Sequence, residues 1–196
     1  MRVLVACEFS GIVRRAFVKA GHAVTSCDLL DAEDSANYSC AGSLGFHWKG
    51  ELFKFLAWRN TNQFDLMVAH PPCTHLAVSG ARWFKNKPVE QVMALAFVRQ
   101  IMGTDIPRIC VENPISIISS RIRKPDQIIQ PWQFGHGETK ATCLWLKNLP
   151  KLVSTNIVAG RAAKVHRMPP GPDRWKDRSR TYTGIAEAMA AQWGAL

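Results

Sequence analysis

The sequence predicts an α/β fold in which helices flank a mostly parallel central sheet. Short apolar runs alternate along the chain with stretches of helical spacing, which is the order of elements in a wound parallel sheet. Polar or prolyl residues directly follow several of these runs. At 196 residues, the chain suits a single domain, residues 1–196, with one sheet and one core.

The beginning of the chain has the pattern strand, turn, helix, strand. Residues 2–7 (RVLVAC) form a short apolar run, and residues 11–20 place apolar side chains at helical spacing. Residues 23–27 (AVTSC) form a second strand-like run that ends at Asp28. A helical crossover joins parallel strands, so these two strands are expected to pair in parallel.

Two more apolar runs, residues 64–69 and 106–111, predict strands, and residues 142–146 are strand-like. Between the first two, residues 89–102 predict a helix with one apolar face, made by Val92, Met93, Leu95, Ala96 and Val98. Ligands of open parallel sheets bind beyond the carboxyl ends of the strands. We therefore expect the chemistry at that edge, among residues that follow the runs: Glu8, Asp28, His70, Pro71, Pro72, Cys73 and Glu112.

The charge of the chain indicates a polyanionic partner. The formal net charge is +10, and residues 116–196 hold 13 Lys and Arg against 5 Asp and Glu. Such an excess attracts nucleic acid through counterion release, whereas a basic solubilising surface is the alternative interpretation. We expect residues 115–181 to form a reduced, basic segment that contacts the substrate.

The sequence carries no strong targeting or disulfide signal. No apolar run is long enough to cross a membrane, and the first residues continue straight into a strand-like run, so we expect a cytoplasmic protein without a membrane partner. The six cysteines contain no CxxC pair, which argues against a zinc ribbon and a disulfide framework. Most are expected to be buried thiols: Cys7, Cys27, Cys40, Cys73, Cys110 and Cys143.

The turn after the first strand suits a ligand that approaches the backbone. Gly11 lies where the chain must bend from strand into helix. The turn lacks the three glycines of a dinucleotide fingerprint, and Arg14 and Arg15 stand where a phosphate loop would have Gly-Lys-Ser/Thr, so nucleotide di- and triphosphates are disfavoured. Asp28, twenty residues after Glu8, suits two ribose hydroxyls, although an aspartate that caps a loop is an equal alternative.

The sharpest local signal is the segment from His70 to His75 (HPPCTH). Two prolines restrict the backbone and hold the thiol of Cys73 in a set direction. A cysteine here acts as a nucleophile once nearby positive charge or a helix end lowers its pKa. The alternatives are metal binding through His70, Cys73 and His75, and an inert buried thiol.

Glu112 ends the next strand, so its carboxyl group and the thiol of Cys73 should project into the same crevice. Attack on carbon 6 of a pyrimidine requires an electrophilic ring. A carboxyl group assists by hydrogen-bonding ring nitrogen 3 and the exocyclic amine. Glu112 fits this role.

With these residues assembled, the chain resembles the cytosine-5 DNA methyltransferase family in a compact, phage-type form without a full target-recognition domain. The matching motifs are a Phe-x-Gly turn, a Pro-Pro-Cys loop and a Glu-Asn-Pro strand end, in this order: residues 8–11, 71–73 and 112–114. Residues 49–52 are similar to the family's Gly-Asp stretch, and residues 182–189 to its final Gly-Asn-Ala helix, without the asparagine. The nearest candidate for the Gln-x-Arg-x-Arg strand is residues 119–123, which lie closer to Glu112 than the family pattern has them.

The resemblance implies a Rossmann-like methyltransferase fold, S-adenosyl-L-methionine as cofactor, DNA as partner, no metal, and a bacterial or phage-infected host cell. Implied cofactor-binding residues are Glu8, Phe9, Ser10, Gly11, Asp28, Glu51, Pro71 and Ala186. Implied catalytic residues are Cys73, Glu112, Arg121 and Arg123. The thiolate adds to carbon 6, carbon 5 takes the methyl group, and a base then removes the carbon 5 proton.

The resemblance covers residues 1–125 and the last twenty, which leaves no room for the usual recognition domain. A free cytosine nucleotide is therefore an alternative substrate, and a non-catalytic nucleic-acid-binding relative is a third hypothesis. An amino methyltransferase matches less well, because that family has an aromatic residue after Pro-Pro where this chain has Cys73. Among the C-terminal aromatic residues, we expect Trp145 and Trp193 in the core, whereas Trp132 and Trp175 are open to stacking on an extruded base.

Overall fold

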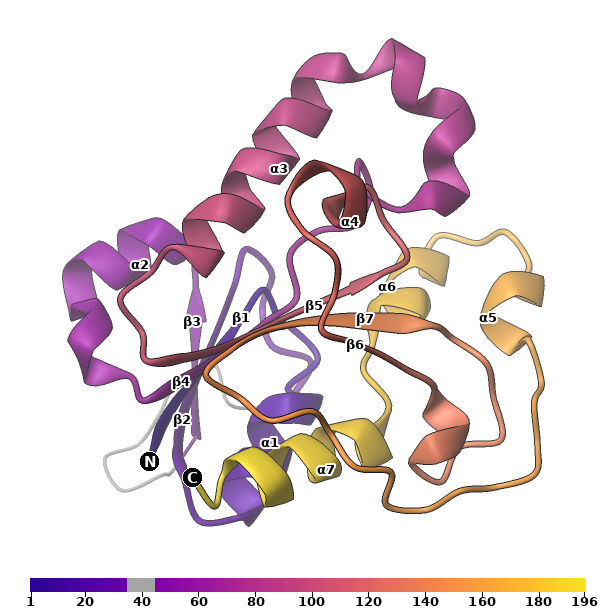
Figure 1. The fold of residues 1–196 in the computed structure, drawn as a ribbon. Coiled ribbons are helices and arrows are strands. Elements are labelled where there is room, and N and C mark those ends of the chain that lie inside the picture. The colour runs from indigo at the N-terminus through magenta and orange to yellow at the C-terminus, as the bar shows by residue number, and fades with distance from the viewer. Residues whose placement is uncertain (35–44) are drawn as a thin grey trace.

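The computed structural model describes residues 1–34 and 45–196, so Cys40 lies outside the described residues. These ranges form one seven-stranded sheet with the order β3-β2-β1-β4-β5-β7-β6. The strands are β1 (Arg2–Ala6), β2 (Ala23–Asp28), β3 (Gly45–Lys49), β4 (Leu66–Ala69), β5 (Arg108–Pro114), β6 (Gln127–Ile129) and β7 (Thr142–Lys147). Figure 1 shows the sheet nearly edge-on between two layers of helices.

The helices cover both faces of the sheet. They are α1 (Ile12–Lys19), α2 (Leu52–Arg59), α3 (Pro88–Met102), α4 (Ile118–Arg121), α5 (Lys164–Arg167), α6 (Arg174–Ser179) and α7 (Thr183–Trp193), with short 3-10 turns η1 (Thr61–Gln63), η2 (Val78–Asn86) and η3 (Pro131–Gln133). The buried side chains of α1 and α7 pack with Val3 and Val5 of β1. Those of α2 and α3 pack with Leu4 and Ala6 of the same strand. Alternate residues of β1 thus serve two separate cores, as the pleat of a strand requires.

Five neighbouring strands, from β3 through β5, pair in parallel. This part of the sheet confirms the predicted α/β, mostly parallel architecture and is compatible with a Rossmann-like fold. The winding direction reverses between β1 and β4, and such a switch point is where open α/β sheets bind ligands. The loops after Ala6 and Ala69 therefore flank the expected binding crevice.

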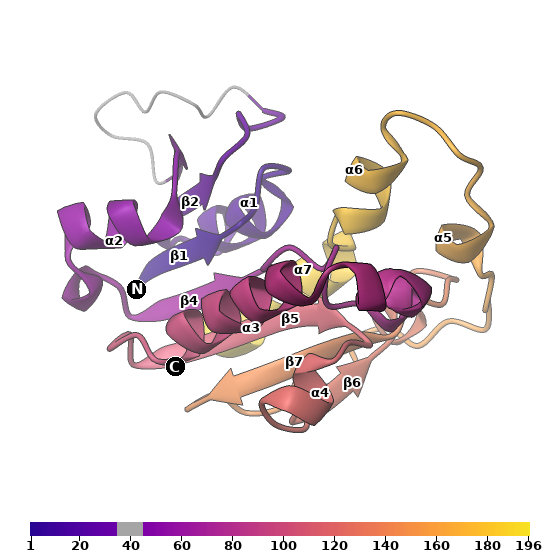
Figure 2. The same ribbon diagram turned by 90° about the horizontal axis from the view of Figure 1, so that it is seen from above.

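The strand β7 runs antiparallel to both β5 and β6, which the sequence analysis did not anticipate. Parallel neighbours need a long crossover, usually a helix, and the segment between β6 and β7 contains only the short η3. In Figure 2 the arrow of β7 points opposite to those of β1, β4 and β5. The first residue of β7, not the last, thus lies at the carboxyl edge of the parallel strands.

The prediction for α3 is right in its bounds and partly wrong in its buried face. Leu95 and Val98 are buried as expected, but Ala96 is exposed, and Val92 and Met93 are 67% and 66% exposed. Figure 1 shows why: α3 is inclined to the sheet and its first half rises away from it, so mainly the second half packs against the strands. The predicted burial of Trp145 and Trp193 is confirmed, with 1% and 0% exposure.

No helix in the two described ranges is both long and apolar enough to cross a membrane.

The start of α7 depends on a close backbone approach at Gly184. A Cβ atom there would lie 1.9 Å from the carbonyl oxygen of Phe134. We expect Gly184→Ala to lower the free energy of unfolding by about 1–3 kcal/mol, because the helix must move away from Phe134. Urea denaturation measures this. The control is Gly171→Ala, where an added Cβ meets nothing within 4 Å and should change stability little; equal effects in both variants would contradict the prediction.

Candidate active site

The loop after β1 is held by the carboxylate of Glu8, which is 5% exposed. It accepts hydrogen bonds from the backbone N–H groups of Val13 at 2.6 Å and Arg14 at 3.2 Å, and from the Ser10 hydroxyl at 3.3 Å. Glu8 therefore caps the first turn of α1, where N–H groups lack helical partners and negative charge is favoured. Its carboxylate is engaged by the chain itself.

The predicted glycine turn is present: Gly11 has a φ of 68°, a conformation that favours glycine. The space beside Gly11 is filled, because an added Cβ would lie 2.5 Å from a guanidinium nitrogen of Arg14 and 2.7 Å from a carboxylate oxygen of Asp34. Asp34 accepts hydrogen bonds from both Arg14 and Arg15 at 2.5 Å. A ligand in contact with Gly11 would have to displace this ion pair.

Asp28 lies at the carboxyl end of β2, beside the loop after β1. Its Oδ1 accepts a hydrogen bond from the backbone N–H of Leu30 at 2.9 Å, so the loop-capping alternative is realised. Burial raises the pKa of Asp28 above its ordinary value, although the backbone hydrogen bond from Leu30 opposes this. The position remains the one from which a carboxylate reaches ribose hydroxyls at a switch point.

Hydrogen bonds hold the loop after β4 in place, and one of them joins it to β5. The side-chain amide of Asn113 donates a hydrogen bond to the carbonyl oxygen of Pro71 at 2.8 Å. The carbonyl of Cys73 accepts from the N–H groups of Leu76 and Ala77 at 3.0 and 2.9 Å. Cys73 itself is half-buried at the start of this turn. These hydrogen bonds hold the backbone of the loop that carries the Cys73 thiol.

His70 and Glu112 form a buried pair across β4 and β5. Ala69 pairs with Val111 in the parallel ladder, so the next residue of each strand is His70 or Glu112. The Nδ1 atom of His70 lies 3.0 Å from Oε2 of Glu112, and the two side chains are 10% and 14% exposed. The register of two parallel strands thus creates a histidine–carboxylate contact three residues before Cys73.

The two members of this pair shift each other's pKa in opposite directions. Burial acts to raise the pKa of Glu112, but the hydrogen bond and charge of His70, the charge of Lys140 and a hydrogen bond from Thr142 lower it overall. Burial acts to lower the pKa of His70, but the hydrogen bond and charge of Glu112 outweigh it and raise that pKa. Each shift favours the charged form of its group, so the contact stabilises an imidazolium beside a carboxylate.

The pKa of Cys73 is raised, which corrects the expectation that nearby positive charge would lower it. Burial is the largest cause, and the negative charge of Glu112 adds to it. Lys140 and Arg178 act in the opposite direction but do not prevail. The resting side chain is a thiol at neutral pH, and its activation depends on the charge state of Glu112.

Lys140 is a site residue that the sequence analysis missed. Its charge acts on both Cys73 and Glu112, and burial lowers its own pKa. Its Nζ donates to the carbonyl of Arg180 at 3.0 Å. Lys140 reaches this edge because β7 is antiparallel: Thr142 pairs with Pro114, so the residues before β7 lie beyond the end of β5. No local motif around Lys140 indicated this.

Arg121 and Arg123 are not brought to Glu112. Arg123 donates to the carbonyl of Leu146 at 3.0 Å, and Leu146 pairs with Cys110, which is two residues before Glu112 and away from the carboxyl edge. Arg123 also pairs with Asp126 at 2.7 Å. Arg121 ends α4 and is exposed. The cation near the carboxylate is Lys140 instead.

Two further residues that were predicted to bind the cofactor make contacts within the protein instead. Ala186 is fully buried in the core, where α7 packs on α1. Glu51 is exposed at the start of α2 and pairs with Lys54 at 3.1 Å. Among the predicted residues, those at the ends of β1, β2, β4 and β5 share one edge of the sheet. Glu51 follows β3, whose last residue Lys49 pairs with Asp28, so it lies at the same edge, but it is engaged with Lys54. Ala186 lies in the core instead.

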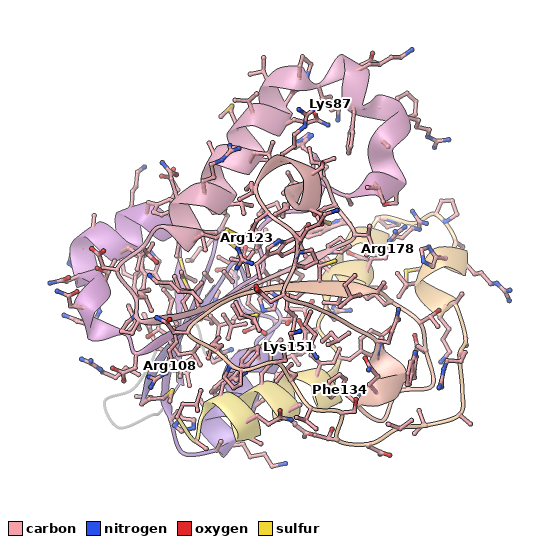
Figure 3. The ribbon with its side chains drawn as sticks, viewed as in Figure 1. Lys87, Arg108, Arg123, Phe134, Lys151 and Arg178 are labelled. Carbon is pink, nitrogen blue, oxygen red and sulfur yellow. The ribbon has the colours of Figure 1, made fainter. Side chains whose placement is uncertain are left out.

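The basic C-terminal segment reaches back to this edge. The ring of Trp175 in α6 lies 5.8 Å from that of Phe9, and Arg180 forms an ion pair with Glu33. Figure 2 shows α5 and α6 on the side toward which β1, β4 and β5 point. In Figure 3, Arg178 lies on that side of the molecule and Arg108, which begins β5, on the other. The segment therefore brings positive charge close to Cys73.

No group of three or more His, Cys, Asp or Glu side chains in the described ranges is arranged to hold a metal ion. The cysteines of these ranges are all free, and Cys27, Cys110 and Cys143 are buried, as expected of inert thiols. Two surface hollows lie at the edge of the sheet where the parallel strands begin, one beside Arg2 and one beside Arg123. The titratable cluster at the carboxyl edge is separate from both.

Compared with protein-family models and with curated protein sequences, the chain matches none. Several titratable groups of this protein gather at the carboxyl edge of its parallel strands. There a half-buried thiol, a largely buried carboxylate–imidazole pair and a half-buried ammonium act on one another.

Proposed function

We propose that this protein is an S-adenosylmethionine-dependent DNA cytosine-5 methyltransferase in which Cys73 is the nucleophile. The observation that carries the proposal is the placement of Cys73 and Glu112 at the carboxyl ends of the neighbouring parallel strands β4 and β5, beside the switch point of the sheet. The negative charge of Glu112 adds to the rise of the Cys73 pKa that burial causes. A thiol and a carboxyl group at one edge of the sheet are the two functions that nucleophilic attack on a pyrimidine ring requires.

Residues at the ends of β1 and β2 fit an adenosyl cofactor. Asp28 offers a carboxylate for ribose hydroxyls, and Gly11 lacks a side chain where the ligand meets the backbone. When bound, the cofactor supplies an electrophilic methyl group. Release of Asp34 from Arg14 and Arg15 opens the space beside Gly11 and leaves two guanidinium groups for the ligand's carboxylate.

The chain's own residues then act on the target base. The thiolate of Cys73 forms a bond to carbon 6 of cytosine, and the carboxyl group of Glu112 holds nitrogen 3 and the exocyclic amine. Lys140 and Arg178 favour the thiolate through their charge, since both lower the pKa of Cys73. A base bound between these groups also excludes water, which strengthens each of these interactions.

The DNA substrate is supported by the basic segment, where residues 116–196 carry 13 Lys and Arg against 5 Asp and Glu. Free cytosine nucleotides are the second candidate. The contacts of Trp175 with Phe9 and of Arg180 with Glu33 draw this segment over the loops of the site, which favours a small substrate.

The decisive experiment is transfer of labelled methyl from S-adenosylmethionine to cytosine-containing DNA, with deoxycytidine nucleotides in parallel. Label on carbon 5 of DNA cytosine is the expected result. DNA binding should weaken steeply with salt, with a log–log slope of about −0.9 per phosphate contacted on a duplex. Label on nucleotides alone would change the substrate, and no label together with no covalent trapping would indicate a non-catalytic nucleic-acid-binding protein.

Cofactor affinity gives a separate test of Asp28. We expect Asp28→Ala to weaken S-adenosylmethionine binding by about 1.5–3 kcal/mol, the contribution of hydrogen bonds to a charged group. Titration calorimetry measures the dissociation constant directly. The control is Asp31→Ala, because Asp31 is exposed and pairs with Lys49 at 2.7 Å. An unchanged affinity in Asp28→Ala would remove this residue from the cofactor site.

A further inference from the structure

The proposed role of Glu112 requires a protonated carboxyl group, but the surroundings of Glu112 lower its pKa and favour the carboxylate. A carboxyl group that donates a hydrogen bond to ring nitrogen 3 must be protonated. Glu112 accepts hydrogen bonds from His70 and Thr142 and faces the positive charge of Lys140, all of which favour the carboxylate. The proton must therefore come from a neighbour.

His70 is the neighbour in place to provide it. Its Nδ1 lies 3.0 Å from Oε2 of Glu112, which is hydrogen-bond distance for direct proton transfer. Its Nε2 is buried without a hydrogen-bond partner, although buried polar atoms are normally satisfied. Of the two ring nitrogens, only Nδ1 is committed to a group of the site, so the transferable proton of the imidazole lies between Nδ1 and Oε2.

We propose that His70 is a positioning residue that passes its Nδ1 proton to Glu112. The transfer protonates the carboxyl group that holds nitrogen 3 of the target base. This inference rests on the proposed function and assigns the origin of a proton within it. The resemblance to the methyltransferase family does not include His70, which enters through the ladder register alone.

The proton and electron balance closes over one cycle. The Cys73 thiol gives its proton to solvent, and the thiolate pair forms the bond to carbon 6 while the ring electrons move toward nitrogen 3. The pair supplies one proton, which passes from Nδ1 of His70 to Glu112 and from Glu112 to nitrogen 3. Carbon 5 takes the methyl group, whose former bonding electrons stay with the donor sulfur. Solvent then takes the carbon 5 proton, the electrons of that C–H bond form the double bond to carbon 6, and Cys73 leaves as a thiolate that regains a proton from solvent. Nitrogen 3 returns its proton through Glu112 to His70, which restores the resting pair.

The transfer also acts on the nucleophile. In the resting pair, the negative charge of Glu112 is one of the causes that raise the pKa of Cys73. Once the proton has moved from His70 to Glu112, this negative charge is gone, while Lys140 and Arg178 remain to favour the thiolate. One proton movement therefore prepares both the acid and the nucleophile.

Charged groups from each packed element face the pair. Glu8, from the loop after β1, acts on His70 and favours its protonated form, and Asp28, at the end of β2, lies within the field of His70. Lys140, before β7, favours the ionised form of Glu112 and opposes the charge on His70. The apparent pKa values in a pH profile thus belong to the coupled set and not to one residue.

The test uses the full chain, S-adenosylmethionine and DNA that contains 5-fluorocytosine, whose fluorine cannot leave as a proton does, so the adduct with Cys73 accumulates. His70→Asn places an amide N–H near Nδ1 and keeps a hydrogen bond to Glu112, but it cannot transfer a proton. We expect its trapping rate to fall by about 10²–10⁴-fold at neutral pH, the usual contribution of a positioned proton donor. The matched control is His75→Asn in the same loop, which should trap at nearly the wild-type rate.

The pH profile separates proton supply from a merely structural role. In the wild type, the trapping rate should decline as pH rises through the raised pKa of His70, because His70 then loses the proton that it supplies. In His70→Asn, Glu112 must take its proton from solvent, so the decline should move to lower pH and the rate should recover as the solution is acidified. Thermal unfolding and cofactor binding of the variant should match the wild type.

A His70→Asn variant with the wild-type rate and profile would overturn the inference while the proposed function stands. Equal losses in His70→Asn and His75→Asn, with no shift of the profile, would also overturn it. A wild-type protein that neither traps nor methylates would remove the proposed function, and the inference with it. The wild-type reaction and the variant comparison therefore report the two failures separately.

Discussion

Methyl transfer to cytosine is expected to be lost in Cys73→Ala, with a fall in kcat of about 10⁴-fold or more, the scale observed when a nucleophile is removed. The physical reason is that the covalent bond to carbon 6 activates carbon 5. No other described thiol can replace Cys73, because Cys110 and Cys143, whose pKa values the charge of Glu112 also raises, are buried. The measurement is single-turnover transfer of labelled methyl, together with trapping on 5-fluorocytosine DNA.

The matched control is Cys143→Ala, which removes a thiol from β7 without touching the loop after β4. It should lose some stability, because it leaves a small cavity, and keep its activity. Cofactor affinity and fold should be unchanged in Cys73→Ala. Substantial transfer by this variant would disprove the nucleophile assigned here and would favour a mechanism without a covalent adduct.

The second large effect is expected in Glu112→Gln, and it has opposite signs on two measurements. Methyl transfer should fall by about 10²–10⁴-fold, because an amide cannot pass a proton to nitrogen 3. Alkylation of Cys73 by iodoacetamide near neutral pH should become faster, because the negative charge that helps to raise the pKa of Cys73 is gone and more thiolate is present. Activity and alkylation are measured on the same preparation.

Glu187→Gln is the control for this variant. Glu187 is an exposed residue of α7 whose nearest cation, Lys19, is 3.8 Å away. It should change neither rate. If alkylation of Cys73 in Glu112→Gln were unchanged or slower, the carboxylate would not be the group that holds the thiol in its protonated form.

Local patterns predicted four of the five parallel strands, β1, β2, β4 and β5, but not β3 (Gly45–Lys49) or the helix α2 that follows it. The apolar runs before Cys7, Asp28, His70 and Glu112 have the length and composition of buried strands, and helical crossovers make such strands parallel. Because parallel strands end at one edge, the proximity of Cys73 to Glu112 followed from their positions in the chain. The capping role of Glu8 was not visible in the sequence, because it depends on where the first N–H groups of α1 point.

What the sequence by itself determined is therefore the α/β class, the strands before the site and the pairing of a thiol with a carboxyl group, since each follows from local periodicity and chain direction. Only the tertiary structure decided the reversed direction of β7, which brings Lys140 to the site and leaves Arg123 away from it, and the ladder register, which sets His70 against Glu112. It also decided the raised pKa of Cys73. Strand direction, register and pKa arise from contacts between residues distant in the chain, and such contacts exist only after the sheet has formed.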